Sequence, residues 1–211
     1  SWREGSAEDR QPRRRGLRLP SVVVFAYLTC ALVWGTTWYV IRVCTGPGGY
    51  PTIEAAALRF ALAAALLAPV VVALRLGPWP RGRRAWAWLA VAGGLNAVSY
   101  GLVYLGEERV PGGLAAVLFA TQPLMLAALI GATGLERVKR TDLSGAVVAL
   151  VGVAIIFADR WQVSAEQAGG LIMILVAVAA SSSYSFILKR EGQGVHPLVS
   201  TFIFLALTAV G

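Results

Sequence analysis

A single arginine stands well inside a long apolar stretch. The segment "PTIEAAALRFALAAALLAPVVVAL", residues 51–74, carries only Glu54 and Arg59 as charged residues. An arginine at the centre of a bilayer costs about 2.5–3.5 kcal/mol, and such residues usually face a bundle interior or a wet cavity. In a cavity, a guanidinium would suit a carboxylate or phosphate group. The alternative is that Arg59 reaches the headgroups along its flexible stem.

A second set of polar side chains lies on one face of the next apolar stretch. Asn96, Tyr100 and Tyr104 are spaced four residues apart, so a helix places them on the same side. Tyr104 is near the helix end, where tyrosine commonly sits at the membrane interface. Asn96 and Tyr100 are deeper, and their polar atoms need partners. Two alternatives stay open, a hydrogen bond to another helix or contact with a substrate.

Two more stretches place aromatic and hydroxyl groups within apolar runs. The segment "WGTTWYVIR", residues 34–42, holds Trp34 and Thr37 beside small residues that permit close helix contact. The segment "SSSYS", residues 181–185, gives a spanning helix either a polar lining or tight packing. Both are candidates for the wall of a cavity between helices.

A proline interrupts the apolar run at 112–133. Pro123 removes one backbone hydrogen bond and predicts a kink in that helix, with the uncharged Gln122 beside the bend. Transporters often bind their substrates at interrupted helices near mid-membrane. The residues predicted to line such a site are Trp34, Thr37, Arg59, Asn96, Tyr100, Gln122, Ser181 and Tyr184.

No Asp or Glu is expected deep in any complete span. Glu54, at a helix mouth, comes nearest to the membrane, and the single histidine, His196, falls in a predicted loop. Proton-coupled pumps usually use a buried carboxylate or histidine. We therefore expect no proton coupling through this part of the chain, unless Glu54 serves or a missing half supplies the group. Cys30 and Cys44 show no metal or disulfide framework, and no cofactor is predicted.

The elements that must hold these residues are apolar helices. The chain has 211 residues, 57% hydrophobic and 14% charged, whereas soluble domains carry about a quarter charged residues. A bilayer span needs roughly 20 apolar residues, and backbone groups in lipid must be paired within a helix. The predicted fold class is an all-α polytopic membrane protein with spans near 21–43, 52–74, 85–105, 112–133, 141–158 and 169–188, and a seventh from 197.

The basic residues follow the predicted connections. Fifteen of the nineteen Lys and Arg fall in the N-terminal segment and in the second, fourth and sixth connections, while only Arg42, Arg109 and Arg160 fall on the opposite side. This is the positive-inside pattern and predicts a cytoplasmic N-terminus. It argues against nucleic acid as the partner of a chain with net charge +8. Residues 1–20 are predicted to be a disordered basic cytoplasmic tail.

An internal repeat appears when the chain is shifted by 146 residues. The pattern G-x-G-x-x-P at 46–51 recurs at 192–197, at the same distance from the preceding helix. Five spans separate the copies, so the second copy enters the membrane from the opposite face, as in inverted-repeat transporters. We expect a first five-helix unit at 21–158, the truncated start of a second at 169–211, and ten spans in the intact inverted-repeat bundle.

The chain resembles the EamA family of the drug/metabolite transporter superfamily. The resemblance is carried by "ALVWGTTWYVIR", by "PTIEAAALRFALAA", and by "YGLVYLGEERVPGGLAAVLFATQPLMLAALIGATGLERVKRTDLSGAVVALVGVAIIF". Arg59, Pro123 and Glu136 fit the family pattern. The resemblance implies a ten-helix exporter of metabolites, amino acids or drugs in the inner membrane. The chain lacks the membrane-embedded glutamate of the small multidrug-resistance relatives, so their proton exchange is not implied.

These observations predict a secondary transporter that exports small metabolites or drugs across the bacterial inner membrane by alternating access. The expected partners are a small-molecule substrate and the lipid bilayer, and a homodimer is left open. One alternative is a membrane-embedded hydrolase using a serine of 181–185, which needs a histidine base nearby. His196 lies beyond the end of that helix, so an enzyme is not expected. The other alternative is a structural membrane subunit that transports nothing.

Overall fold

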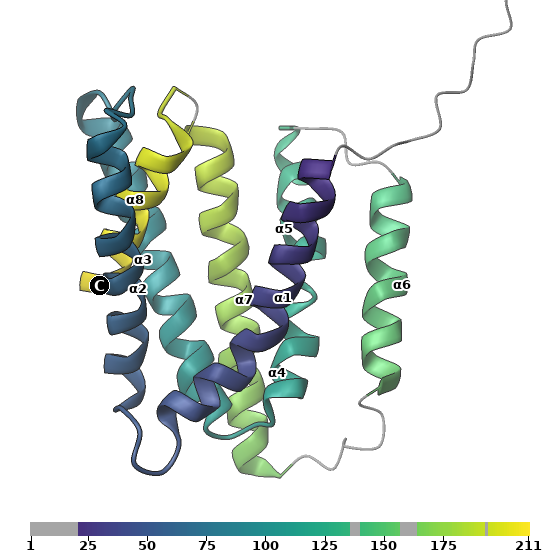
Figure 1. Cartoon of the computed structure of the whole chain (residues 1–211). Coiled ribbons are helices and arrows are strands. Elements are labelled where there is room, and N and C mark those ends of the chain that lie inside the picture. The colour runs from purple at the N-terminus through teal and green to yellow at the C-terminus, as the bar shows by residue number, and fades with distance from the viewer. Residues whose placement is uncertain (1–20, 136–139, 157–163, 193) are drawn as a thin grey trace, which may run out of the picture. The chain divides into compact units, whose positions relative to one another are not determined.

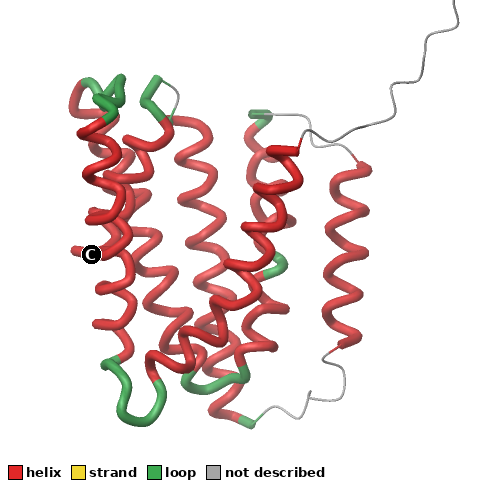
Figure 2. The backbone as a smooth tube through the Cα atoms, in the orientation of Figure 1, coloured by secondary structure: helices red, strands yellow, loops and turns green. Residues whose placement is uncertain are grey.

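The computed structural model describes residues 21–135, 140–156, 164–192 and 194–211. The predicted tail at 1–20 lies outside these residues, as do Glu136, Arg137, Lys139 and Arg160. The chain divides into two compact units, residues 1–37 and 38–211, and each is described by itself. In the described ranges the regular structure is helical throughout, in agreement with the predicted fold class (Figure 2).

The helices follow the predicted spans closely, and most boundaries differ by a few residues. They are α1 Ser21–Thr45, α2 Thr52–Ala73, α3 Gly82–Glu107, α4 Gly112–Phe119, α5 Gln122–Thr133, α6 Arg140–Ile156, α7 Ala165–Glu191 and α8 Pro197–Val210 (Figure 1). Within the described residues, five helical segments are long and apolar enough to cross a membrane, with α4 and α5 taken together as one of them. The described part of α6 and the whole of α8 are shorter.

The first unit contains most of α1. Its adjacent residues Thr36 and Thr37 bond backward along the helix: Thr36 Oγ1 donates to the carbonyl oxygen of Leu32 at 2.9 Å, and Thr37 Oγ1 donates to that of Val33 at 2.7 Å. Such bonds to the preceding turn satisfy a hydroxyl without water. These two hydroxyl groups can therefore lie in an apolar environment without being unpaired.

In the second unit, α3 is the central element. It packs along α7 and also contacts α8, while α2 packs against α8, and α4 and α5 pack on the other side of α7 (Figure 1). Glycines permit the close approach of α3 to both neighbours. A Cβ atom at Gly93 would lie 2.6 Å from Leu207 Cβ, and one at Gly106 would lie 2.8 Å from Ile174 Cδ1. Small residues at such crossings are how membrane helices pack without a hydrophobic driving force.

The buried and exposed positions suit a membrane bundle. Val103, Ala115, Ile174 and other apolar side chains form one core where α3, α4 and α7 meet, and a second core joins α2, α3 and α8. The outer face of α2 exposes large apolar side chains at regular helical spacing, at Leu58, Leu62 and Leu66. An exposed apolar face of this kind marks a surface that meets lipid or another apolar partner.

At the predicted kink, Pro123 closely follows a two-residue break between α4 and α5. The helix α4 ends at Phe119, and α5 starts at Gln122 with Pro123 in its first turn. Proline has no N–H, and its ring clashes with the carbonyl group four residues earlier, which here belongs to Phe119. The same residue is well tolerated at a helix start. Thr121 bridges the break, since its hydroxyl donates to the carbonyl oxygen of Leu118 at 2.6 Å.

The repeated G-x-G-x-x-P pattern builds the same turn twice. Gly48 and Gly194 both have a left-handed backbone, with φ of 81° and 87°. The N–H of Gly49 donates to Gly46 at 2.8 Å, and at the matching position Val195 donates to Gly192 at 3.4 Å. The two turns lie at opposite ends of the second unit (Figure 1). An inverted repeat requires this arrangement, because its copies run in opposite directions.

Contacts at the two ends agree with the grouping of the connections. Arg84 at the start of α3 forms a salt bridge with Glu191 at the end of α7, with 3.2 Å between Nη2 and Oε1. At the other end, Arg42 Nη2 donates to the carbonyl oxygen of Val110 at 3.1 Å. The charge pattern assigns the second and sixth connections to one side and the first and third to the other, and each of these contacts joins two connections of the same side.

Candidate functional site

Arg59 points toward α3. Its Cζ atom lies 5.5 Å from the ring centroid of Tyr100 and 5.9 Å from that of Phe60. A guanidinium within about 6 Å of an aromatic centroid is attracted by the ring. The position follows from the buried stripe of α2, which includes Ala55, Ala56 and Phe60 and lies next to Arg59. The side chain therefore has a partner within the bundle, which favours the interior alternative over the headgroup alternative.

Tyr100 joins this cation to an aromatic pair. Its ring meets the Phe60 ring edge to face, with centroids 4.7 Å apart and planes at 77°. Edge-to-face contacts of this kind stabilise aromatic pairs by about 0.5–1.5 kcal/mol beyond area burial. Tyr100 is fixed on α3 by the buried neighbours Ser99 and Val103. The rings of Phe60 and Tyr100 are thus held firmly where α2 meets α3.

A cavity of about 300 Å³ adjoins the aromatic pair. It lies between α2, α3 and the last turn of α8, and its volume is at the lower end of the range for ligand pockets. Small alanine side chains leave the space, the rings of Phe60 and Tyr100 give it shape, and the lining residues Tyr100 and Thr208 carry hydroxyl groups. The lining residues are Ile53, Ala56, Ala57, Phe60, Ala97, Val98, Tyr100, Gly101, Thr208, Ala209, Val210 and Gly211.

Asn96 links α3 to α8 beside this cavity. Its Nδ2 donates to Thr208 Oγ1 at 3.1 Å, and the Thr208 hydroxyl donates to the carbonyl oxygen of Phe204 at 2.8 Å. Asn96 is fully buried, at 1% exposed, and its Oδ1 has no hydrogen-bond partner among the described residues. The amide nitrogen thus supports the first alternative, a hydrogen bond to another helix. The amide oxygen has no partner among the described residues and leaves the second, contact with a substrate, open.

The other predicted site residues lie elsewhere in the second unit. Ser181 is buried in α7, and the ring of Tyr184 packs against Phe204 with centroids 5.1 Å apart. The neighbouring Ser182 hydroxyl donates to the backbone carbonyl of Gln122 at 3.4 Å, which joins α7 to α5. These residues are not among those that line the 300 Å³ cavity. Trp34 and Thr37 belong to the first unit.

The groups that a serine hydrolase would use have other contacts. Ser183 Oγ donates to the carbonyl oxygen of Ala179 at 2.8 Å. His196 caps α8, where its Nδ1 accepts the N–H of Leu198 at 3.3 Å. Within the described residues, no group of three or more His, Cys, Asp or Glu could hold a metal ion. These contacts are those of helix packing and capping.

Glu107 is the residue that sequence reasoning missed. It closes α3, is 4% exposed, and neither carboxylate oxygen has a hydrogen-bond partner among the described residues. The predicted span ends at residue 105 and leaves Glu107 in the following loop, whereas α3 runs two residues further and its last turn is covered. Helical spacing could have indicated this residue, because Glu107 follows Tyr104 by three residues and continues the helix face of Asn96 and Tyr100.

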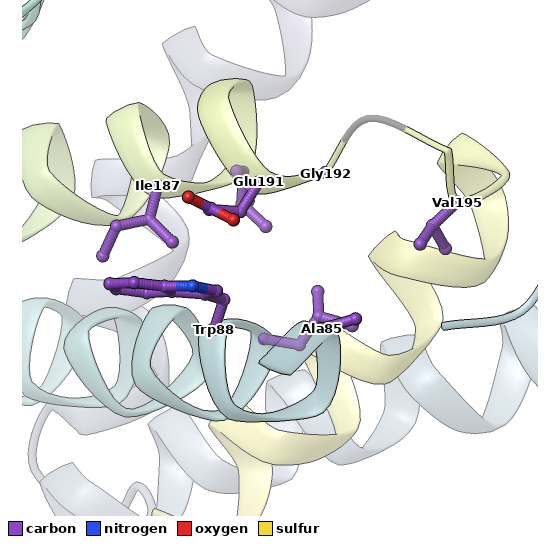
Figure 3. Close-up of a pocket in the computed structure, with 8 residues that line it drawn as sticks. Ala85, Trp88, Ile187, Glu191, Gly192 and Val195 are labelled. Carbon is purple, nitrogen blue, oxygen red and sulfur yellow. The ribbon is translucent and has the colours of Figure 1, made fainter. Parts of the chain in front are cut away.

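A small pocket at the other end of α3 shows a different arrangement. Figure 3 shows Trp88 and Ile187 beside Glu191, whose carboxylate lies near the indole ring. The volume of this pocket, about 10 Å³, leaves room for roughly one water molecule. Glu191 is held by its salt bridge to Arg84. This pocket is part of the packing of α3 against α7 and not a ligand site.

The described helices define a polytopic helical membrane protein. The chain belongs to the EamA-like transporter family, whose model matches residues 21–158. Its relatives place it within the drug/metabolite transporter superfamily. The matched range covers α1 to α6 and includes the Arg59–Tyr100 contact, Glu107 and the interrupted α4–α5 span.

Curated relatives agree with this assignment. The chain is 28% identical to the uncharacterized inner membrane transporter YedA of Escherichia coli, over 70% of this chain and 47% of that protein. It is 28% identical to the protein PagO of Salmonella typhimurium, over 67% and 46%, and 27% identical to the protein PecM of Dickeya dadantii, over 83% and 55%. The chain thus spans about half the length of these relatives. No solved structure gave a significant match.

Proposed function

We propose that this chain is part of a secondary transporter that exports a small metabolite or drug across the bacterial inner membrane. The observation that carries the proposal is the cavity beside Phe60 and Tyr100, together with the arginine cation that rests on the Tyr100 ring. An arginine in a membrane segment is costly, and such residues usually mark a substrate or ion pathway. Here it stands next to a space large enough for a small molecule.

Alternating access gives this arrangement a mechanism. The duplicated turns at opposite ends support two units of inverted topology that rock against each other around a fixed site. In the complete protein the substrate would bind between the two units near mid-membrane. On this proposal the first unit comprises residues 21–158, the second begins at 169–211, and the N-terminus is cytoplasmic.

The eight residues predicted from sequence have different roles in this proposal. Arg59 and Tyr100 contribute the cation and the aromatic wall, and Asn96 positions Thr208 at the cavity. Gln122, Ser181 and Tyr184 lie where α7 meets α5 and α8, and we propose that they reach the pathway in another conformation of the cycle. Trp34 and Thr37 remain candidates on α1.

The decisive experiment replaces Arg59 in the full-length protein. Compounds exported by cells with and without the gene are compared first, so that the transported compound is identified. We then expect Arg59→Ala to reduce export of that compound at least about tenfold, which corresponds to ~1.4 kcal/mol of lost stabilisation along the transport pathway. Export is measured in cells that contain equal amounts of the protein in the membrane.

Leu58→Ala is the matched control, because Leu58 is the neighbour of Arg59 on α2 and is 52% exposed. It should leave export unchanged. Arg59→Lys keeps the charge but loses the planar group that stacks on a ring. Its export should lie between that of Arg59→Ala and that of Leu58→Ala. Wild-type export by Arg59→Ala would assign the arginine to the headgroup region and remove the main support for this site.

A further inference from the structure

The carboxyl group of Glu107 is enclosed without a donor. Charged side chains are almost never fully buried unless paired, and an ion left unpaired in an apolar setting costs far more than a neutral polar group. Glu107 is 4% exposed, and both of its oxygens lack a hydrogen-bond partner among the described residues. A neighbouring acid shows the contrast, since Glu108 is exposed and accepts the hydroxyl of Thr52.

The carboxyl group rests against the start of α4. Its Oε1 lies 3.5 Å from the place that a Cβ on Gly112 would occupy. The first turn of a helix carries N–H groups without intrahelical partners and a positive partial charge, so it attracts an anion. The helix α4 itself, Gly112–Phe119, has no ionisable side chain.

Few charges face this corner from the neighbouring elements. Arg42, in the last turn of α1, acts electrostatically on Glu107. On its own element Glu107 is near Tyr104 and is followed by Glu108 and Arg109, whose guanidinium approaches Gly169 of α7. The first turn of α7 carries the exposed Glu166. The turn after α1 is glycine-rich and carries no charge.

Arg42 has a choice of two acceptors at this corner. Its Nη2 donates to the backbone carbonyl of Val110, three residues after Glu107, at 3.1 Å. A hydrogen bond from a guanidinium to a carboxylate is roughly twice as strong as one between neutral groups. An ionised Glu107 therefore competes with Val110 for Arg42, and a neutral Glu107 does not.

We infer that Glu107 is a proton-binding site that couples transport to the proton gradient. The inference rests on the proposed function and differs from the sequence expectation, which named only Glu54 or a missing half as a source of such a group. The carboxylate takes one proton from water at the α3–α4 end and, after the two units have rocked, releases it to water on the other side of the membrane, so that the proton moves down its gradient. With the proton bound, Arg42 stays on Val110. With the proton lost, Arg42 moves to the carboxylate and draws the end of α1 toward that of α3.

The first test measures proton binding directly and needs no substrate. Infrared difference spectra of the purified full-length protein, taken between acidic and alkaline buffer, should show a buried carboxyl group that gains and loses a proton. The signal should disappear in Glu107→Gln and persist in Glu108→Gln and Glu107→Asp. A signal that persists in Glu107→Gln would overturn the inference, provided that the variant is folded by circular dichroism.

The second test measures transport in vesicles that contain the full-length protein and the compound identified by the export comparison. A pH gradient should drive uphill movement by wild type and Glu108→Gln. Glu107→Gln should lose this component and retain exchange down the compound's own gradient. Equal responses of wild type and Glu107→Gln to the pH gradient would overturn the inference, as would flux driven by a sodium gradient alone.

The two proposals can fail separately in these tests. A wild-type protein that moves no compound under any gradient would overturn the proposed transport function, while the infrared signal would still decide whether Glu107 binds a proton. A wild-type protein that exports the compound without any pH dependence would leave transport in place and remove Glu107 as the coupling group.

Discussion

The middle and the end of α3 treat polar groups in opposite ways. Near the middle, the amide nitrogen of Asn96 bonds to Thr208 and only its uncharged Oδ1 lacks a partner among the described residues, while the ring of Tyr100 meets both Phe60 and Arg59. At the end, one turn beyond Tyr104, Glu107 is buried with no hydrogen-bond partner among the described residues. Partnered groups fix a structure, whereas an unpartnered ionisable group leaves it sensitive to its protonation state. One helix thus supplies two kinds of region. Its middle, from Gly93 to Tyr100, packs against α2 and α8 and is called the rigid wall below, whereas its end at Glu107 responds to protonation.

The largest effect should come from breaking the rigid wall at Gly93. Gly93→Leu puts a side chain where Leu207 Cβ is 2.6 Å from the new Cβ position. Overpacking of this kind costs up to about 3 kcal/mol, occasionally more. We therefore expect most molecules of this variant not to fold. The yield of monodisperse full-length protein in size-exclusion chromatography measures this loss.

Gly94→Leu is the matched control, since nothing lies within 4 Å of a Cβ at Gly94. It should keep a near-normal yield. If both variants behave alike, α3 and α8 do not approach closely in the intact protein, and the rigid-wall description of this region fails.

A smaller effect is expected from the hydrogen bond that joins α3 to α8. Thr208→Val keeps the shape of the side chain and leaves the Asn96 amide without its acceptor. Interhelical bonds in membrane proteins contribute about 0.6 kcal/mol on average and up to about 1.7, so the thermal midpoint of the purified protein should fall modestly. Thr201→Val, which removes a bond to Pro197 within α8, is the comparison. Equal midpoints for Thr208→Val and wild type would remove Asn96 as a link between the helices.

The smallest effect is expected from Tyr100→Phe. The ring, and with it the contacts to Arg59 and Phe60, is kept, because both contacts are to the ring centroid. A cation–ring contact depends on the ring face and not on the hydroxyl, so export should stay within about twofold of wild type. Tyr100→Ala should lose far more. If Tyr100→Phe were as defective as Tyr100→Ala, the hydroxyl would be the group that matters.

Much of the fold follows from local sequence. Apolar runs of spanning length predict α1 to α3 and α7 to within a few residues, because in lipid each run must pair its own backbone. The G-x-G-x-x-P pattern also predicts corresponding turns, whose second glycine has positive φ in both copies. Pro123 was correctly recognised as a disturbance, but whether a proline bends or ends a helix depends on packing around it, which a sequence does not display.

The partners of the polar groups were beyond sequence reasoning. That Arg59 meets Tyr100 depends on how α2 and α3 are aligned along each other, and the spacing within either helix does not determine this. The Asn96 amide bonds to Thr208, which lies 112 residues further along the sequence. Glu107 was missed because helix ends are the least certain part of a prediction, and a difference of two residues changed a loop carboxylate into a buried one.

The paired glycines Gly48 and Gly194 carry a consequence for natural variation in this protein. Each corner needs a residue that tolerates a left-handed backbone, which restricts both positions to glycine or, at some cost, asparagine. This requirement comes from the backbone conformation, so it does not depend on the solvent, the lipid leaflet or the membrane voltage around the turn. The two sites, at opposite ends of the second unit, are therefore expected to accept the same one or two residue types, whatever compound the proposed transporter exports.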